Sequence, residues 1–272
     1  MLLAYRIRLA LLFLASFFSA SAAQNDSITA APAPWTLDVA EGWLFVLPPL
    51  LSSEFLPPGF ARPSEASAEE STGIMTIDPG LILIVRYSSS PVGPYDELIY
   101  IPGKWAYADG MEGFRITTIY VSSNESVYNG RENWNIPKHL ATFDFQTDIL
   151  GGTTLSVSSP ENGSTFFSVN LLPTTLEIPL EVSLALTGNY LNFVQPPIPN
   201  GTLPVEIGTT TWDQFLLNGQ TTSVQASLIS GALPGGRIGD GVGYPDVQPL
   251  LPVGVKLTGT LDFPVSRIFE SV

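Results

Sequence analysis

The sequence contains no cysteine and a single histidine, His139. The absence of cysteine excludes disulfides, zinc–thiolate sites, iron–sulfur clusters and thiol nucleophiles, and one histidine is too few for a histidine-rich metal centre. We therefore expect no metal and no cofactor. Basic residues are also scarce, because 11 lysines and arginines stand against 25 acids, and the formal net charge is −14. A charge of this sign repels phosphate backbones and anionic lipid heads, so we expect binding to neither nucleic acid nor membrane surfaces.

The first residues have the pattern of a secretory leader. Arg6 and Arg8 supply positive charge, residues 9–18 are apolar, and small residues at 19–23 offer a cleavage site before Gln24. The apolar run is shorter than the roughly 20 residues of a membrane-spanning helix. We predict a signal peptide at 1–23 and a linker at 24–34, with the protein secreted or in the secretory-pathway lumen and no membrane contact after cleavage. An uncleaved signal anchor is the alternative.

Asn-x-Ser/Thr sequons without proline in the middle position agree with a secretory route. They are candidate glycosylation sites at Asn25, Asn124, Asn162 and Asn200. A secreted domain without disulfides must be stabilised by its core alone, which a chain of 272 residues permits.

The remaining sequence has the pattern of a β protein. It is 44% hydrophobic and 13% charged, which excludes disorder for most of the chain, and its 24 glycines and 24 prolines are typical of many turns. Alternating or continuous apolar runs predict strands at 80–87, 95–101, 114–122, 139–147, 153–158, 164–172, 175–187, 205–209, 221–228 and 254–263.

Helices are predicted to be few and short. No long segment after the leader has an apolar stripe at helical spacing, and the best candidates are residues 50–55 and 264–270. Residues 63–72, with Glu65, Glu69 and Glu70, are predicted to form an exposed loop. We therefore predict a mainly β (α+β) fold in one domain, residues 35–272, with a barrel or sandwich core.

Lysine is rare, and one lysine has an unusual context. Beyond Lys104 and Lys256, the chain has only Lys138, which follows Ile136-Pro137 at the start of a predicted strand. It is either an edge residue with its amine in solvent or a buried amine. Burial disfavours the ammonium form, and a neutral lysine can form a Schiff base whose iminium withdraws electrons from the substrate.

The residues around this lysine resemble a known family. Gly130-Arg131-Glu132, a short spacer and then Ile136-Pro137-Lys138 resemble the signature of the acetoacetate decarboxylase superfamily. Pro94-Tyr95-Asp96-Glu97-Leu98 is similar to the family segment that carries an active-site glutamate, and Gly259-Thr260-Leu261-Asp262-Phe263-Pro264 is similar to its closing strand. The resemblance covers residues 35–269, and similar secreted chains are fungal.

The resemblance implies a β-barrel core wrapped by antiparallel strands, with Lys138 inside as the Schiff-base lysine and Glu97 as the acid or base. Substrate-binding candidates are Arg131, Arg115, Trp134 and His139. For Arg131, structural hydrogen bonding is the alternative.

This sequence departs from the family pattern at several positions. His139 replaces a second lysine, is expected to be mostly neutral, and as a strand neighbour points away from Lys138. The family arginine would fall near Glu41 or Gly42, and its other glutamate would fall in residues 80–85, which contain no acid. Arg86 or Arg115 can replace the missing cation.

These departures favour a substrate bulkier and less charged than acetoacetate. We expect a secretory-pathway enzyme that acts on a keto or enone small molecule through a Lys138 iminium, by decarboxylation, aldol or dehydration chemistry, or cyclisation, in natural-product biosynthesis. The alternatives are a non-catalytic barrel that binds an apolar small molecule and a barrel enzyme that does not use the lysine. A homo-oligomer is left open.

Overall fold

The main feature of the fold is a curled ten-stranded sheet. The computed structural model describes residues 28–70 and 73–271, so the predicted leader and the Asn25 sequon lie outside the described residues. Neighbouring strands of this sheet run antiparallel, apart from the parallel pair β7 and β8. The strand order is β8 (Lys138–Leu140), β7 (Thr118–Val121), β4 (Tyr95–Ile101), β3 (Gly80–Ser89), β1 (Trp35–Leu47), β15 (Val253–Phe263), β14 (Asn218–Gly231), β11 (Thr165–Pro179), β10 (Thr153–Ser158) and β9 (Thr142–Thr147).

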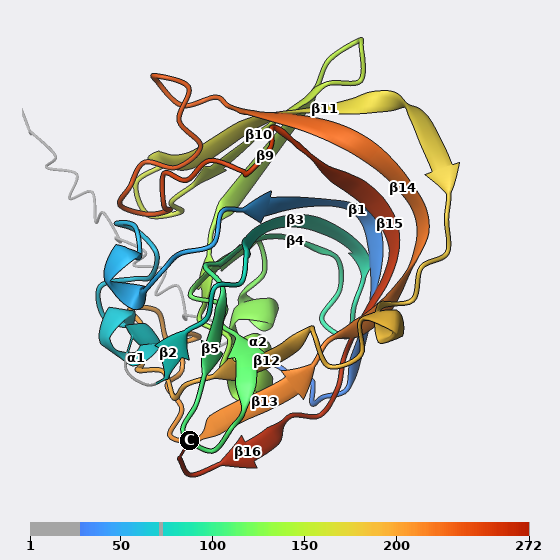
Figure 1. Ribbon diagram of the computed structural model, residues 1–272. Coiled ribbons are helices and arrows are strands. Elements are labelled where there is room, and N and C mark those ends of the chain that lie inside the picture. Colours follow the sequence, from blue (N-terminus) through green and yellow to red (C-terminus); the bar gives the residue numbers. More distant parts are fainter. Residues whose placement is uncertain (1–27, 71–72, 272) are drawn as a thin grey trace, which may run out of the picture.

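A second, smaller sheet lies below the arcs of β1, β3 and β4 in Figure 1. Its order is β16 (Arg267–Phe269), β13 (Trp212–Leu216), β12 (Asn192–Gln195), β6 (Glu112–Phe114), β5 (Lys104–Ala106) and β2 (Ile74–Met75). The helical elements among the described residues are all short: η1 (Ser53–Phe55), α1 (Ala66–Glu70), α2 (Asn124–Trp134) and η2 (Leu184–Thr187). The predicted mainly β fold with few short helices is confirmed.

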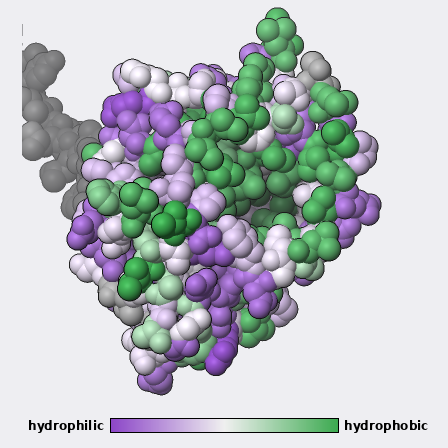
Figure 2. All heavy atoms as spheres, viewed as in Figure 1, coloured by the Kyte–Doolittle hydropathy of each residue, from purple (hydrophilic) through white to green (hydrophobic). Residues whose placement is uncertain are grey.

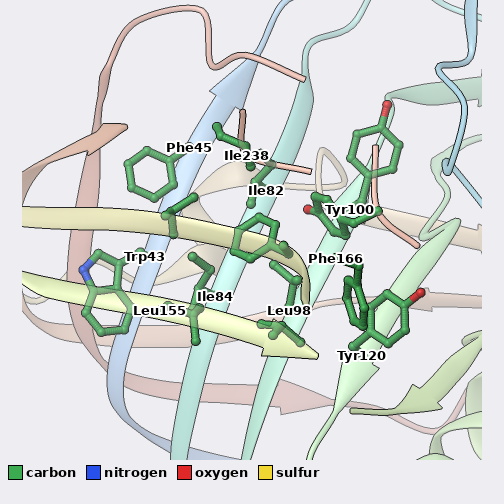
Figure 3. Packing of buried hydrophobic residues seen from close by; sticks show 14 of the residues in the cluster. Trp43, Phe45, Ile82, Ile84, Leu98, Tyr100, Tyr120, Leu155, Phe166 and Ile238 are labelled. Carbon is green, nitrogen blue, oxygen red and sulfur yellow. The ribbon is translucent and has the colours of Figure 1, made fainter. Parts of the chain in front are cut away.

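The curled sheet separates two hydrophobic cores. On one face of β3, Ile82 and Ile84 are fully buried in the core drawn in Figure 3, where they pack with side chains of β1, β4, β10 and β11. On the other face, Leu81 and Leu83 pack against the core formed with α2 and the second sheet. The continuous apolar run of residues 80–87 is explained by this position, because both faces of β3 meet apolar neighbours.

A β-bulge in β1 lets one strand serve both cores. Its register against β3 and β15 shifts between Val39 and Gly42. Before the bulge, Trp35 and Leu37 belong to the core beside α2; after it, Trp43 and Phe45 belong to the core inside the curl. An inserted residue shifts the side-chain alternation by one position.

The individual strand predictions have different outcomes. Five predicted strands are confirmed: 80–87 in β3, 95–101 in β4, 153–158 in β10, 221–228 in β14 and 254–263 in β15. Two other predicted strands, 114–122 and 139–147, each span two strands of the structure. The predicted strand at 175–187 is wrong beyond Pro179, where β11 ends, and residues 205–209 form no strand. The C-terminal helix at 264–270 is wrong, because β16 pairs there with β13.

Helix α2 is the element that the sequence pattern concealed. It begins after Ser123, whose side chain accepts a hydrogen bond from the Ser126 N–H, and it ends at Asn135 in a left-handed conformation. Its buried face carries Ser126, Val127, Asn129, Gly130, Arg131 and Trp134. Because most of these residues are polar or lack a side chain, no apolar stripe marks the helix.

The prediction of an exposed loop at 63–72 is also wrong for residues 65–70, and residues 71 and 72 lie outside the described residues. Helix α1 lies within this segment, and Glu65 and Glu69 are both fully buried. Glu65 has cationic partners, described below, whereas neither carboxyl oxygen of Glu69 has a hydrogen-bond partner among the residues that the structure describes. Burial therefore raises the pKa of Glu69 to about 8, despite the opposing charge of Arg115.

We predict that Glu69 makes the stability of the protein fall as the pH rises from about 4.5 to about 8. The folded state holds a proton on Glu69 that the unfolded state releases, so this contribution is complete below the unfolded pKa and lost through the folded pKa. Glu69→Gln should remove the decline and raise the free energy of unfolding at pH 8.5 by on the order of a few kcal/mol. Denaturant melts at pH 5, 7 and 8.5 measure this effect. Glu70→Gln, at the exposed neighbouring position, is the matched control, and equal profiles for both variants would contradict the prediction.

Candidate active site

Lys138 is the first residue of β8, at the edge of the curled sheet. It pairs with Ile119 of β7, and its side chain is only 4% exposed. Helix α2 covers it, and Gly130 makes the close packing possible: a Cβ there would lie 2.5 Å from Lys138 Cδ and 2.7 Å from Cε. The glycine of the Gly-Arg-Glu motif therefore provides the space for the lysine side chain.

The amine of Lys138 has three polar neighbours. Nζ donates to Glu97 Oε2 at 2.8 Å and to Ser126 Oγ at 3.0 Å, and it lies 3.5 Å from the hydroxyl of Tyr95. It also lies 5.1 Å from the centre of the Tyr95 ring. The structure thus brings together the two predicted catalytic residues, Lys138 and Glu97, from strands 41 residues apart.

Glu97 is also bound by a tyrosine. The hydroxyl of Tyr87 donates to Glu97 Oε1 at 2.9 Å, and the rings of Tyr87 and Tyr95 lie 4.8 Å apart. Burial, reinforced by the Glu97 carboxylate, raises the pKa of both tyrosines well above the usual value. Both hydroxyls therefore stay protonated at neutral pH, beside a carboxylate and an amine that can exchange a proton.

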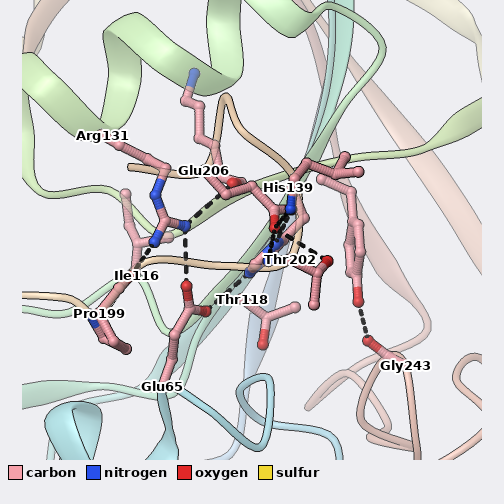
Figure 4. A network of polar contacts seen from close by, with 12 residues as sticks. Glu65, Ile116, Thr118, Arg131, His139, Pro199, Thr202, Glu206 and Gly243 are labelled. Carbon is pink, nitrogen blue, oxygen red and sulfur yellow. Dashed lines mark hydrogen bonds and ion pairs between the residues drawn. The ribbon is translucent and has the colours of Figure 1, made fainter. Parts of the chain in front are cut away.

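His139 points away from Lys138, as the alternation of side chains along a strand predicts. Its ring nitrogens lie 2.6 Å from Glu206 Oε1 and 2.8 Å from Glu65 Oε2 (Figure 4). Burial alone would lower the pKa of His139, but hydrogen bonds to the two glutamates outweigh it and raise the pKa. The expectation of a mostly neutral histidine overlooked these carboxylates, which lie 67 and 74 residues away in the sequence.

Glu206 and Arg131 complete this buried network. Burial would raise the pKa of Glu206, but its bonds to His139 and to two backbone N–H groups lower it to about 2. Arg131 pairs with Glu65 at 2.9 Å and donates to the carbonyls of Ile207, Pro199 and Lys138. Arg131 therefore contacts the backbone of Lys138 rather than its amine. These are the structural hydrogen bonds named as its alternative role.

The other predicted substrate-binding residues have different neighbours. Arg115 donates to the hydroxyl of Tyr107 at 3.0 Å and to the carbonyl of Glu69 at 2.6 Å. Trp134 donates to the carbonyl of Pro264 at 2.7 Å and packs on the ring of Trp35.

Arg86, the other candidate cation, pairs with Glu41 and Asp96 and is partly exposed. No described contact brings Arg86, Arg115 or Trp134 to the amine of Lys138.

The sequence analysis missed several residues of the site. Tyr95 shares the face of β4 with Glu97 at a spacing of two, which is a signal that alternation along a strand could have provided. Ser126 has no such signal, because α2 itself was not predicted. The sequence analysis placed Glu65 in an exposed loop and Glu206 in a strand. That both carboxylates bind His139 becomes visible only when the folded positions of these residues are known.

Two cavities border the residues around Lys138. A polar one of about 430 Å³ is lined by Tyr87 and Tyr95, together with Glu41 and Arg86. An apolar one of about 130 Å³ is lined by Val85 and other aliphatic and aromatic side chains. Because Val85 pairs with Glu97 across β3 and β4, the Lys138–Glu97 pair lies near both cavities.

Other expectations concern metals, membranes and glycans. The described residues contain no group of three or more potential ligands placed to hold a metal ion. Within residues 28–70 and 73–271, no helix has the length and hydropathy to cross a membrane. The sequon residues Asn124, Asn162 and Asn200 are exposed, whereas the site at Asn25 lies outside the described residues.

Comparisons with known proteins point to one family. The family model for acetoacetate decarboxylase matches residues 75–205, which include Glu97 and Lys138. The chain is similar in structure to the acetoacetate decarboxylase of Legionella pneumophila subsp. pneumophila str. Philadelphia 1, with a TM-score of 0.59, 15% identity, and coverage of 89% of this chain and 90% of that one.

Two further solved structures are similar to this chain. One, from structural studies of acetoacetate decarboxylase, has a TM-score of 0.55 and 13% identity, with 89% of this chain and 91% of that one covered. The other, the enduracididine biosynthesis enzyme MppR with HEPES buffer bound, has a TM-score of 0.52 and 12% identity, with 89% and 90% covered. At these identities the likeness concerns the fold, and no curated protein matches the sequence. The family-model match over residues 75–205 and the similar fold support a relationship between this chain and the acetoacetate decarboxylase superfamily.

Proposed function

We propose that this protein is an enzyme that acts on a keto or enone small molecule through an iminium at Lys138. One observation carries the proposal: the Lys138 amine is buried 2.8 Å from Glu97 Oε2, beside two protonated tyrosines. Burial disfavours the ammonium form of a lysine, and an adjacent group can accept the proton that the amine must lose before it attacks a carbonyl. Of the lysines in the chain, Lys104 instead lies over aromatic rings and Lys256 pairs with Glu41 at a partly exposed position.

The steps of the proposed reaction follow from these contacts. Glu97 accepts a proton from the Lys138 ammonium, and the neutral amine attacks the carbonyl carbon of the substrate. The resulting carbinolamine loses water, with the proton held by Glu97 returned to the departing hydroxyl, and the product is an iminium. The iminium then accepts the electron pair of a neighbouring bond, and hydrolysis of the product imine releases Lys138.

The bond that breaks determines the reaction class. Release of carbon dioxide from a 3-oxo acid leaves an enamine; protonation on carbon gives an iminium, and its hydrolysis gives the ketone and frees Lys138. Loss of a proton instead gives an enamine for aldol addition, dehydration or cyclisation. A role in natural-product biosynthesis is supported by the common fold with MppR, an enzyme of enduracididine biosynthesis, and fold analogy alone does not identify the substrate.

A second candidate is a barrel that binds an apolar small molecule without chemistry. The apolar cavity beside Val85 favours it, as does the absence of an acid in residues 80–85. Trapping of a covalent intermediate separates the two candidates, because only the enzyme forms a bond to Lys138.

We predict that sodium borohydride, added with acetoacetate or 2,4-pentanedione, attaches the reduced carbonyl compound to Lys138. Borohydride converts an imine into a stable secondary amine, which peptide mass spectrometry assigns to one lysine. Lys256→Met is the control and should label as the wild type does, whereas Lys138→Met should not label. An adduct on Lys104 or Lys256 alone, or none with either carbonyl compound, would contradict the proposal.

We further predict an order of labelling rates among variants of the site. Glu97→Gln removes the proton acceptor and should slow labelling about 100-fold, the size of a general acid–base contribution. His139→Asn should slow it least, because that ring faces Glu65 and Glu206 instead of the amine. Since Lys138→Met leaves a buried carboxylate without its cation, the double variant Lys138→Met/Glu97→Gln serves as its folding control. Equal rates for the Glu97 and His139 variants would refute the assigned roles.

The proposal includes passage through the secretory pathway. Expression in a eukaryotic secretory host should give a protein that begins near residue 24 and loses mass on treatment with an N-glycosidase. Asn162→Gln should remove one glycan, whereas Asn170→Gln, which is equally exposed but outside a sequon, should change nothing. An intact N-terminus together with no response to the glycosidase would rule out this part of the proposal.

A further inference from the structure

Lys138 ends a row of apolar residues that crosses the curled sheet. Side chains at paired positions of neighbouring strands lie on the same face, so the pairing registers define the row. From β8 to β14 it runs Lys138, Ile119, Ile99, Leu83, Leu44, Val255 and Ala226. The reactive amine is the only charged group in this row.

A parallel row begins at Glu97 and is equally apolar. From β4 to β11 it runs Glu97, Val85, Gly42, Leu257, Val224 and Ile178. The two rows therefore form one apolar strip with the Lys138–Glu97 pair at one end. Gly42, near which the family arginine would fall, lies in the middle of the strip.

The cavity of about 130 Å³ lies on this strip. Its floor includes Leu44, Leu83 and Val85, and Leu184 of η2 and Phe193 of β12 lie opposite. Every side chain that lines it is aliphatic or aromatic, apart from Gly42, which has none. Apolar cavities of about 150 Å³ accommodate a molecule the size of benzene, so the volume suits about six carbon atoms.

Beyond the cavity, the strip reaches the surface. Ile178 is 47% exposed and Val255 is 39% exposed. Figure 2 shows apolar side chains gathered around a hollow over β1, β14 and β15. An apolar surface of this kind marks a binding site more often than a chance arrangement. The strip thus runs from solvent, through an apolar cavity, to the buried amine.

The charge of the protein restricts what can occupy the strip. A net charge of −14 opposes both self-association and attraction to anionic lipid surfaces. It does not oppose an uncharged hydrocarbon chain. None of the described side chains that line the cavity is charged, and the burial of a charged group without a partner is unfavourable.

We propose that this cavity binds an uncharged hydrocarbon tail of the carbonyl compound that reacts at Lys138. The inference rests on the proposed function and specifies its substrate class: a keto or enone compound with an apolar substituent of about six carbons. The carbonyl lies at Lys138, the tail fills the cavity over Leu83 and Leu44, and a longer tail continues onto β14 and β11.

Straight-chain alcohols test the cavity without any chemistry at the lysine. In calorimetric titrations of the wild-type protein from butan-1-ol to octan-1-ol, affinity should rise about fourfold per methylene until the cavity is full. Leu184→Gln places an amide at the cavity rim and should weaken octan-1-ol binding about fivefold to tenfold. Leu186→Gln, in the same 3₁₀ helix but 83% exposed and outside the lining, is the matched control. Both substitutions lie at the surface of η2, where folding is not at risk.

Two results would overturn the inference: an affinity that does not change with chain length, and equal effects of the Leu184 and Leu186 variants. A dimer whose formation excludes octan-1-ol, seen by analytical ultracentrifugation, would also overturn it.

Borohydride trapping with propanal and octanal then connects the cavity to the lysine, with faster labelling of Lys138 expected for octanal. Labelling that is independent of tail length would refute the inference and leave the proposed function intact. Chain-length-dependent alcohol binding without any adduct would refute the proposed function and leave an apolar binding site.

Discussion

The shared carboxylate of Glu65 is the interaction on which the site depends. One of its oxygens accepts from Arg131 of α2, and the other lies 2.8 Å from His139 of β8. A buried carboxylate is tolerated only when cations and donors surround it. Its burial therefore requires α2 and β8 to lie together beside the segment that leads into α1. Arg131 adds bonds to the carbonyls of Ile207, Pro199 and Lys138, so the same contacts hold the backbone of the lysine.

Two ionic groups occupy opposite faces of β8 and serve different purposes. On one face, His139 lies between Glu65 and Glu206, and every described charge there has a partner. On the other face, Lys138 has one carboxylate, one serine and the two tyrosines around Glu97. The first group gives β8 a fixed position. The second places a proton donor and a proton acceptor at hydrogen-bonding distance, as acid–base chemistry at an amine requires.

The strand registers place the departures from the family pattern in one region of the sheet. The apolar strip passes through or beside Glu41, Gly42 and residues 80–85, which are the positions where the sequence analysis expects charged groups in the family. Leu83, Gly42 and Leu257 face the same cavity. Glu41 pairs with Arg86 and Lys256, whereas the uncharged residues Leu83, Val85 and Gly42 lie on the side of Glu97 that faces the cavity. These surroundings agree with the proposed hydrocarbon substituent.

The sequence by itself determined the mainly β class, the strands at 80–87 and 95–101, and the identity of Lys138 and Glu97 as a candidate pair. Those features depend on local alternation and on a short motif. Only the tertiary structure decided that Glu65 is buried, that Ser126 reaches the amine, and that β1 changes cores at its bulge. Whether a charge can be buried depends on partners such as Arg131, which lies 66 residues from Glu65. No local pattern contains that information, because the partners meet only when the chain has folded.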